Sequence, residues 1–363
     1  MIKPSEFITD LKPYVPGKPL EELEREFGIK DSIKLASNEN PLGPSPLAFK
    51  AVLKHLQNSQ GITAFSRYPD GSGYYLKKAL CKKLSVNEDE IILGNGSNEL
   101  IDIVARAFLQ PGDEAVMANP SFIVYPMSVK SVGAVPIQIP LKNYTHDLNA
   151  MFEAVNPLTK MFFIANPNNP TGTINRKHEL DYLMERLPED ILVVIDEAYY
   201  EYVTDPEYAD SMKHFRDGRD ILILRTFSKI YGLAGLRIGY GVARSHIISE
   251  MNKIRPPFNT GTISQQAALW ALKDDTHIKS SRKVNENGKR YLYRQLEILR
   301  VNYVPTEANF IYIILNCDAN DIFNKLLKKG VIVRPVGPQE IRVTIGLPDE
   351  NKRFVKALKE VIG

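Results

Sequence analysis

In the middle of the chain, segments with a helical spacing of apolar residues alternate with short segments that are apolar throughout. Residues 97–109 are predicted to form a helix, because Ser97 or Asn98 can cap its start and apolar side chains then recur three and four positions apart. Strand-like segments occur at residues 90–93, 114–117, 161–165, 191–195 and 221–224. Several of them are apolar throughout, as is typical of strands covered on both faces. This alternation predicts an α/β fold with a mostly parallel sheet.

The pattern changes in the last hundred residues. Residues 263–300 have a mainly helical pattern, and a small α+β unit is predicted after them, with strands at 309–315 and 340–345 and helices at 318–329 and 350–362. The first 46 residues are rich in proline and polar residues, and we expect them to pack against this unit or against a neighbouring subunit. Three parts are therefore predicted: an N-terminal segment (1–46), a large domain (47–262) and a small C-terminal domain with its connecting helix (263–363).

The composition excludes several classes of protein. The chain has 363 residues, 44% of them hydrophobic, and a net charge of +3, which predicts a soluble globular protein without a general attraction to nucleic acid or membranes. Its two cysteines, Cys81 and Cys317, are too far apart in sequence for a disulfide framework, which favours a reducing cytoplasm. We found no apolar signal core or membrane-spanning stretch, and no histidines at zinc-ligand spacing, so we expect no metal site.

Lys229 carries the most informative chemistry. An isolated lysine usually lies on the surface, but this one follows a predicted buried strand, and ligands of open α/β sheets bind at the carboxyl ends of strands. Thr226 and Ser228 place hydroxyl groups beside it, and Arg237 follows shortly after. The amine can form a Schiff base with an aldehyde, while the hydroxyls and the guanidinium hold a phosphate. The segment predicts a pyridoxal phosphate (PLP) site.

Asp196 and Tyr199 follow another predicted strand. An aspartate in this position can cap a helix, bind a metal or pair with a cation, and in a PLP site it pairs with the pyridine nitrogen and keeps it protonated. Tyr199 is either a half-buried core tyrosine or a donor to the ring oxygen of the cofactor.

Two further segments have the composition of loops at such a site. Residues 166–172 read Asn-Pro-Asn-Asn-Pro-Thr-Gly, a tight turn from which one asparagine can point at the cofactor's ring oxygen. Residues 93–99 form a Gly-rich turn before the predicted helix, where free N–H groups favour an anion. This turn lacks the Gly-Lys-Ser/Thr ending of a P-loop and contains no GxGxxG, which argues against nucleotide binding.

In this order the four segments resemble those of the fold-type I, aspartate-aminotransferase-like PLP enzymes. Within that group the chain is similar to the histidinol-phosphate aminotransferase family at residues 13–19, 35–45, 67–71 and 341–346. The loop at 335–341 is shorter than in many relatives. The resemblance implies the fold-type I PLP-transferase fold, with a large domain on a mostly parallel sheet and a smaller α+β domain.

The resemblance also implies roles for individual residues. Lys229 would be the Schiff-base lysine and would move the proton between the substrate and the cofactor. Tyr68 would reach the cofactor phosphate of the other subunit, so the active site would need a homodimer. The other implied cofactor contacts are Ser97, Asn98, Phe122, Asn169, Asp196, Tyr199, Thr226, Ser228 and Arg237. The implied substrate contacts are Arg342, Tyr14, Asn40 and Arg334.

The implied reaction is the transamination of L-histidinol phosphate with 2-oxoglutarate in histidine biosynthesis. Two alternatives keep the cofactor: a decarboxylase of the threonine-phosphate type and a broad aromatic aminotransferase. A third is a ligand-binding regulatory module, which is disfavoured because residues 1–46 are too short and too rich in proline for a helix-turn-helix.

Overall fold

The computed structural model describes residues 2–14, 17–57 and 64–362. Within them the main sheet has seven strands in the order β2-β8-β7-β6-β5-β3-β4. Only β8 runs antiparallel to its neighbours in this sheet, and the other neighbouring strands are parallel. The predicted α/β class is confirmed. The strands are β2 (Ile91–Gly94), β3 (Glu114–Asn119), β4 (Val135–Pro140), β5 (Thr159–Ala165), β6 (Leu192–Asp196), β7 (Ile221–Thr226) and β8 (Gly239–Val242).

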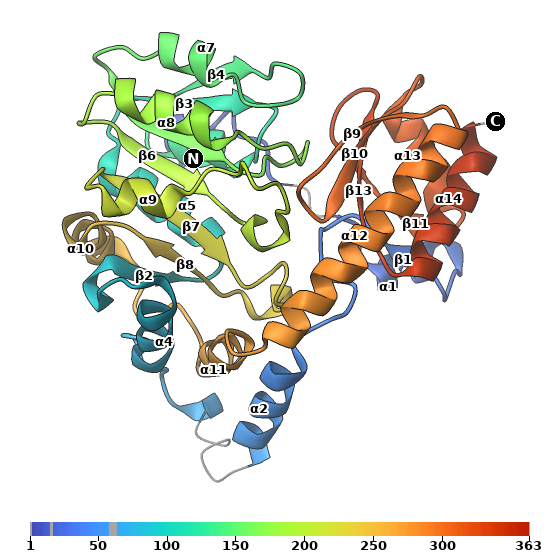
Figure 1. Cartoon of the computed structure of the whole chain (residues 1–363), viewed down its shortest axis with the longest axis horizontal. Helices are drawn as coiled ribbons and strands as arrows, with labels where there is room; N and C mark the ends of the chain where they lie inside the picture. Colours follow the sequence, from blue (N-terminus) through green and yellow to red (C-terminus); the bar gives the residue numbers. More distant parts are fainter. Residues whose placement is uncertain (1, 15–16, 58–63, 363) are drawn as a thin grey trace.

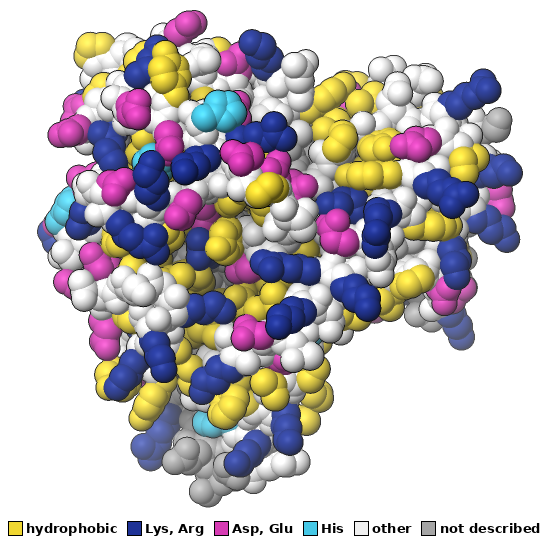
Figure 2. Space-filling model, in the orientation of Figure 1, with side chains coloured by type: hydrophobic (Ala, Val, Ile, Leu, Met, Phe, Trp, Pro, Cys, Tyr) yellow, Lys and Arg dark blue, Asp and Glu magenta, His cyan; other side chains and the backbone are white. Residues whose placement is uncertain are grey.

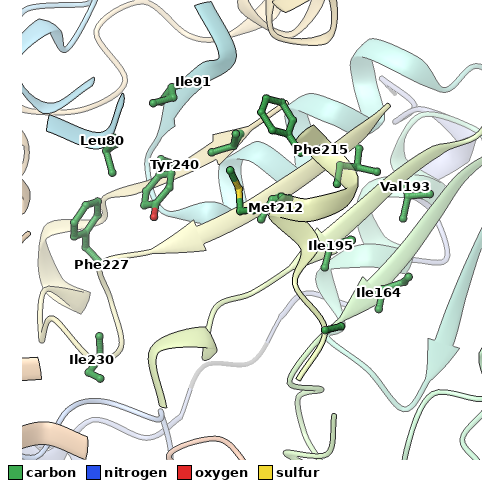
Figure 3. Close-up of a cluster of buried hydrophobic side chains, with 14 of the residues drawn as sticks. Leu80, Ile91, Ile164, Val193, Ile195, Met212, Phe215, Phe227, Ile230 and Tyr240 are labelled. Carbon is green, nitrogen blue, oxygen red and sulfur yellow. The ribbon is translucent and has the colours of Figure 1, made fainter. Parts of the chain in front are cut away.

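Helices cover both faces of this sheet. Neighbouring residues of a strand face opposite sides, so Val193 and Ile195 join one buried cluster while Leu192 and Val194 join the other. Figure 3 shows Ile164, Val193 and Ile195 near Met212 and Phe215 in the first cluster. This cluster also receives side chains from α2 (Pro46–Gln57), α4 (Tyr74–Leu84), α7 (Leu148–Glu153), α8 (Lys177–Arg186), α9 (Ser211–Arg216) and α11 (Thr262–Ala271). The second cluster receives side chains from α5 (Ser97–Phe108), α6 (Val124–Ser131) and α10 (Ser245–Ile254).

A smaller unit is built on a four-stranded antiparallel sheet in the order β12-β13-β10-β9. The long helix α12 (Asp275–Ile298) runs between the two units (Figure 1) and contributes Leu292 and Leu296 to the core of the smaller one. The other elements of the unit are β9 (Asn302–Val304), β10 (Phe310–Ile314), α13 (Ala319–Leu327), β11 (Val331–Ile332), β12 (Arg334–Pro335), β13 (Glu340–Thr344) and α14 (Pro348–Ile362).

The N-terminal segment contacts both units. Its strand β1 (Ile33–Lys34) pairs with β11, and Leu23 of α1 (Leu20–Phe27) packs against the small unit. Helix α1 lies beside the small unit in Figure 1. Its first turn, η1 (Glu6–Ile8), lies on α6, where the ring of Phe7 comes so close to Gly133 that a Cβ there would lie 2.8 Å from Cζ. The segment therefore joins the small unit to the large one. Three more short 3₁₀ helices are η2 (Glu88–Glu90), η3 (Tyr200–Tyr202) and η4 (Ala234–Leu236).

The predicted domain boundary after residue 262 stays a prediction. Helix α11 (Thr262–Ala271) follows this boundary in sequence but packs on the large unit. Ala267, Ala268 and Ala271 of α11 are buried in the first cluster of the large sheet, and α11 packs on α2 and α4. On the face seen in Figure 2, acidic and basic side chains are interspersed. Among the described residues, no helix is long and apolar enough to cross a bilayer.

Candidate active site

A cavity of about 1080 Å³ opens at the edge of the large sheet where the parallel strands end. The segments that follow β2, β5, β6 and β7 all contribute to its wall, because parallel strands share a carboxyl edge. The N-terminal segment and the small unit close the other side through Tyr14, Arg334 and Arg342. The cavity therefore has walls from both units.

Most of the predicted site residues line this cavity. The described structure brings together Tyr14, Ser97, Asn98, Phe122, Asn169, Asp196, Tyr199, Thr226, Ser228, Lys229, Arg237, Arg334 and Arg342. They come from seven separate stretches of sequence, so the fold rather than the local sequence assembles them.

The structure does not bring Asn40 and Tyr68 to the cavity wall. The side chain of Asn40 is buried, and its Nδ2 donates to the carbonyl of Ile230 (2.7 Å) and to Oγ of Ser281 (2.9 Å). These contacts hold the loop after β1 in place. Tyr68 is 82% exposed and stacks on Phe258, with the ring centroids 4.6 Å apart.

An anion cup lies at the start of α5. The N-cap residue Gly96 (φ 77°) has no side chain, and a Cβ there would lie 2.7 Å from Nη2 of Arg237. A Cβ at Gly239 would lie 2.5 Å from the backbone nitrogen of Ser97. The two glycines therefore let a guanidinium approach the positive end of a helix, and together these groups favour a phosphate. Thr226 and Ser228 also line this cavity.

Lys229 lies among groups that disfavour its charge. Burial, followed by the guanidinium of Arg342, lowers the pKa of Lys229 to about 8. Its Nζ donates to the carbonyl of Ser37 (3.2 Å) and lies 5.6 Å from the ring centre of Tyr199. A large fraction of this lysine is neutral near pH 8, which makes it a nucleophile and a base.

Asp196 ends β6 as a buried carboxylate. Burial raises its pKa to about 6, although the hydroxyl of Tyr125 (2.8 Å) and the backbone N–H of Ala198 (3.1 Å) donate to it and stabilise its charge. No cation lies within ion-pair distance of this carboxylate among the described residues. A cationic ligand in the cavity would supply the missing partner.

Two arginines of the small unit form a second anion-binding region. The short loop between β12 and β13 makes a tight hairpin, with the N–H of Val336 bonded to the carbonyl of Glu340 (2.9 Å). This hairpin pairs Arg334 with Arg342 across the two strands. Arg342 donates to Asn169 Oδ1 (2.6 Å) and to the carbonyl of Ala36 (2.7 Å), while its Nε is buried with no partner in the described part of the chain. Two adjacent guanidinium groups favour a phosphate or a carboxylate.

Sequence reasoning missed two residues that contact this site. Tyr125 donates to Asp196, and Asn38 donates from Nδ2 to the hydroxyl of Tyr199 (2.9 Å). The spacing along the chain could have indicated Tyr125. It follows the predicted contact Phe122 by three residues, Ser128 follows three residues later, and all three line the cavity. The contact of Asn38 joins residues 161 positions apart, and no local pattern indicates it.

The residues present fit pyridoxal phosphate. The cup at Gly96 and Arg237 suits its phosphate, Asp196 suits its protonated ring nitrogen, and Lys229 suits its aldehyde. No group of three or more histidine, cysteine or acidic side chains in the described part of the chain could hold a metal ion.

The two-unit fold and this cavity are those of an aminotransferase, and the chain belongs to the aminotransferase class I and II family, whose model matches residues 30–358. A histidinol-phosphate aminotransferase of Moorella thermoacetica is 49% identical over 98% of this chain and 92% of its own length. One from Caldicellulosiruptor saccharolyticus is 46% identical over 98% of this chain and 99% of its own. The solved structure of histidinol-phosphate aminotransferase from Sinorhizobium meliloti in complex with pyridoxal-5'-phosphate is similar with a TM-score of 0.90, at 27% identity, over 100% of this chain and 98% of that one.

Proposed function

We propose that this chain is a PLP-dependent aminotransferase that transfers the amino group of L-histidinol phosphate to 2-oxoglutarate, giving imidazole acetol phosphate and L-glutamate in histidine biosynthesis. The observation that carries the proposal is one cavity that combines a lysine of lowered pKa, a buried carboxylate, an anion cup and a second region with two arginines. Relatives that are 46–49% identical over nearly the whole chain carry this name.

The lining of the cavity supports a set of residues that would hold the cofactor. The backbone N–H groups of Ser97 and Asn98, with Thr226, Ser228 and Arg237, would bind its phosphate. Asp196 would pair with the ring nitrogen, Asn169 and Tyr199 would bind the ring oxygen, and Phe122 would pack on the ring face. When bound, pyridoxal phosphate supplies an aldehyde for the amino group and a ring that accepts electrons from the substrate's α carbon.

Lys229 would handle the proton. Its amine, with a pKa of about 8, can take a proton from the α carbon and return it to the neighbouring carbon of the cofactor. Arg342 lowers this pKa by its charge, so the group that binds the substrate anion also favours the neutral, basic lysine.

Arg342 and Arg334 would bind the anionic end of each substrate. Both half-reactions present an anion at this place, the phosphate of histidinol phosphate or a carboxylate of glutamate, and a guanidinium pair suits either. Tyr14 lies near Arg334, whose guanidinium carbon is 5.5 Å from its ring centre, and would cover this end of the pocket.

The decarboxylase and the broad aromatic aminotransferase are not favoured. Relatives that are 46–49% identical over nearly the whole chain are histidinol-phosphate aminotransferases. The two arginines also suit a substrate with an anionic end better than an uncharged aromatic one, which disfavours the aromatic aminotransferase.

The proposal is tested by the visible absorbance of the protein loaded with pyridoxal phosphate. Addition of L-histidinol phosphate alone is expected to remove the visible band, and 2-oxoglutarate is expected to restore it. A band that L-phenylalanine removes equally well at the same concentration would favour the aromatic aminotransferase. Release of carbon dioxide without a need for a keto acid would favour the decarboxylase. A protein that acquires no band contradicts the cofactor assignment.

The proposal includes a homodimer that shares its active sites. Tyr68 is highly exposed and absent from the cavity of its own chain, so its hydroxyl is available to the phosphate cup of a second subunit. The helices α2, α4 and α11 pack together nearby and expose Leu47, Phe49, Leu53, Tyr75 and Trp270. Apolar side chains grouped in this way favour a subunit interface.

Mixing two inactive variants tests the shared site. Lys229→Ala and Tyr68→Ala each impair both sites of their own dimer, but a hybrid dimer carries one site with both native residues. Random exchange of subunits is expected to restore about a quarter of the wild-type activity, because half of the dimers are hybrids with one intact site each. If activity in the mixture never exceeds that of the separate variants although subunits exchange, each site is made by a single chain.

A further inference from the structure

Residues 36–38 cross between the two units inside the cavity wall. Each of these three consecutive residues contacts a different site residue: the carbonyl of Ala36 accepts from Arg342 (2.7 Å), the carbonyl of Ser37 accepts from Lys229 (3.2 Å), and Nδ2 of Asn38 donates to the hydroxyl of Tyr199 (2.9 Å). Only the contact of Asn38 is made by a side chain. A substitution there changes the contacts of the amide, with Tyr199 and with Thr344, and leaves the two carbonyls in place.

The small unit fixes the orientation of the Asn38 amide. The hydroxyl of Thr344, at the end of β13, donates to Oδ1 of Asn38 (3.2 Å) and accepts from its backbone N–H (2.9 Å). Since Oδ1 is turned toward Thr344, the amide can only donate to Tyr199. Asn38 is 1% exposed and has a φ of 56°, a conformation in which asparagine is enriched and larger side chains are strained.

This contact determines where the Tyr199 proton points. The phenolic oxygen accepts from Asn38, so its own hydrogen is directed elsewhere. Tyr199 lines the cavity, where the proposed ring oxygen of the cofactor would accept that hydrogen. We propose that Asn38 is a positioning residue, which orients the hydroxyl of Tyr199 toward the ring oxygen and links this orientation to the small unit through Thr344.

This inference rests on the proposed function. Four other titratable groups influence Tyr199, namely Arg342, Asp196, Tyr14 and Lys229. Burial raises the pKa of Tyr199 above its ordinary value, while Arg342 and the hydrogen bond from Asn38 act in the opposite direction. The phenol is therefore protonated at neutral pH and able to donate.

The decisive variant is Asn38→Gly, because glycine accepts the positive φ, adds no charge and removes only the amide. Without the orienting amide, Tyr199 donates less to the ring oxygen, more negative charge stays on that oxygen, and a nearby proton is held more tightly. The midpoint pH of the cofactor's visible absorbance band is expected to rise by about one unit, the size of one hydrogen bond to a charged group. Tyr199→Phe is expected to shift the midpoint in the same direction.

The double variant Asn38→Gly/Tyr199→Phe separates an effect through Tyr199 from any other. If Asn38 acts through Tyr199, adding Asn38→Gly to Tyr199→Phe gives no further shift. Thr344→Val is expected to shift the midpoint in the same direction as Asn38→Gly. Asn143→Gly is the matched control, since Asn143 also has a positive φ (50°) but lies in an exposed turn outside the cavity, and it is expected to keep the wild-type midpoint.

Two results overturn the inference while leaving the proposed function intact. The first is a wild-type midpoint in Asn38→Gly. The second is a shift caused by Asn38→Gly that is as large in the Tyr199→Phe protein as in the wild type. A wild-type protein that shows no cofactor band overturns both the proposed function and this inference.

Discussion

Replacement of Lys229 by alanine is expected to reduce amino transfer by about 10⁴-fold or more, because one side chain supplies both the covalent attachment and the proton transfer. No second lysine lines the cavity in the described structure. Arginine at this position would keep a cation but remain protonated, so Lys229→Arg is expected to be as inactive as Lys229→Ala. The measurement is the single-turnover rate of the protein loaded with pyridoxal phosphate and mixed with L-histidinol phosphate.

Two controls separate chemistry from folding. Lys253→Ala removes a lysine that pairs with Glu250 on the exposed side of α10, and it is expected to leave the rate unchanged. Burial lowers the pKa of the Lys229 amine, so Lys229→Ala removes an unfavourable buried group. The cofactor-free variant is therefore expected to keep the unfolding temperature of the wild type. Full turnover by Lys229→Ala would contradict the catalytic assignment.

The sequence predicted the large sheet well because its strands are buried on both faces. Apolar runs located β2, β3, β5, β6 and β7 within two residues at each end. The differences have a physical cause, since backbone pairing continues beyond the apolar residues. Thr226, for example, still pairs with Gly239, and Asn119 still pairs with β4.

The candidate site divides into residues that local motifs indicate and residues that only the tertiary structure places. Asp196 ends a strand, and Lys229 and Gly96 follow strand ends, where the fold class itself predicts a ligand. Tyr125 and Asp196 are 71 residues apart, and their hydrogen bond depends on how α6 packs on the sheet. Asn40 lies in a segment that resembles a substrate-binding motif, but its amide is used by the carbonyl of Ile230 and the hydroxyl of Ser281. A sequence pattern does not distinguish these two uses of an asparagine.

Replacement of Asp196 by asparagine is expected to lower kcat/KM by about 10³-fold, because removing one partner of a buried ion pair costs ~3–5 kcal/mol and each ~1.4 kcal/mol is a factor of ten. The variant should keep its fold. An amide oxygen can still accept from the N–H of Ala198, and the hydroxyl of Tyr125 can turn to accept from the new NH₂ group. Asp220→Asn is the matched control, because Asp220 is a partly exposed aspartate just before β7, and it is expected to keep wild-type activity.

The pH dependence of cofactor affinity gives this prediction a second measurement. Asp196 has its pKa raised to about 6 by burial, so it is ionised above that pH and protonated below it. The wild type is therefore expected to bind pyridoxal phosphate more tightly than Asp196→Asn at pH 8, and this advantage should shrink as the pH falls below about 6. A constant ratio of the two dissociation constants across this range would contradict an ion pair between Asp196 and the cofactor.

The stability of the cofactor-free protein should follow the opposite trend. The folded wild type holds the Asp196 proton up to about pH 6, whereas an ordinary aspartate releases it near 3.8, so the contribution of this group to stability falls as the pH rises between these values. An asparagine at position 196 has no carboxyl proton, so it makes no such pH-dependent contribution to stability. At pH 8 the cofactor-free Asp196→Asn protein is therefore expected to unfold at a temperature no lower than the wild type, and only the wild type should gain strongly on adding pyridoxal phosphate. A carboxylate that destabilises the empty site and strengthens the loaded one is placed for its ligand rather than for the fold.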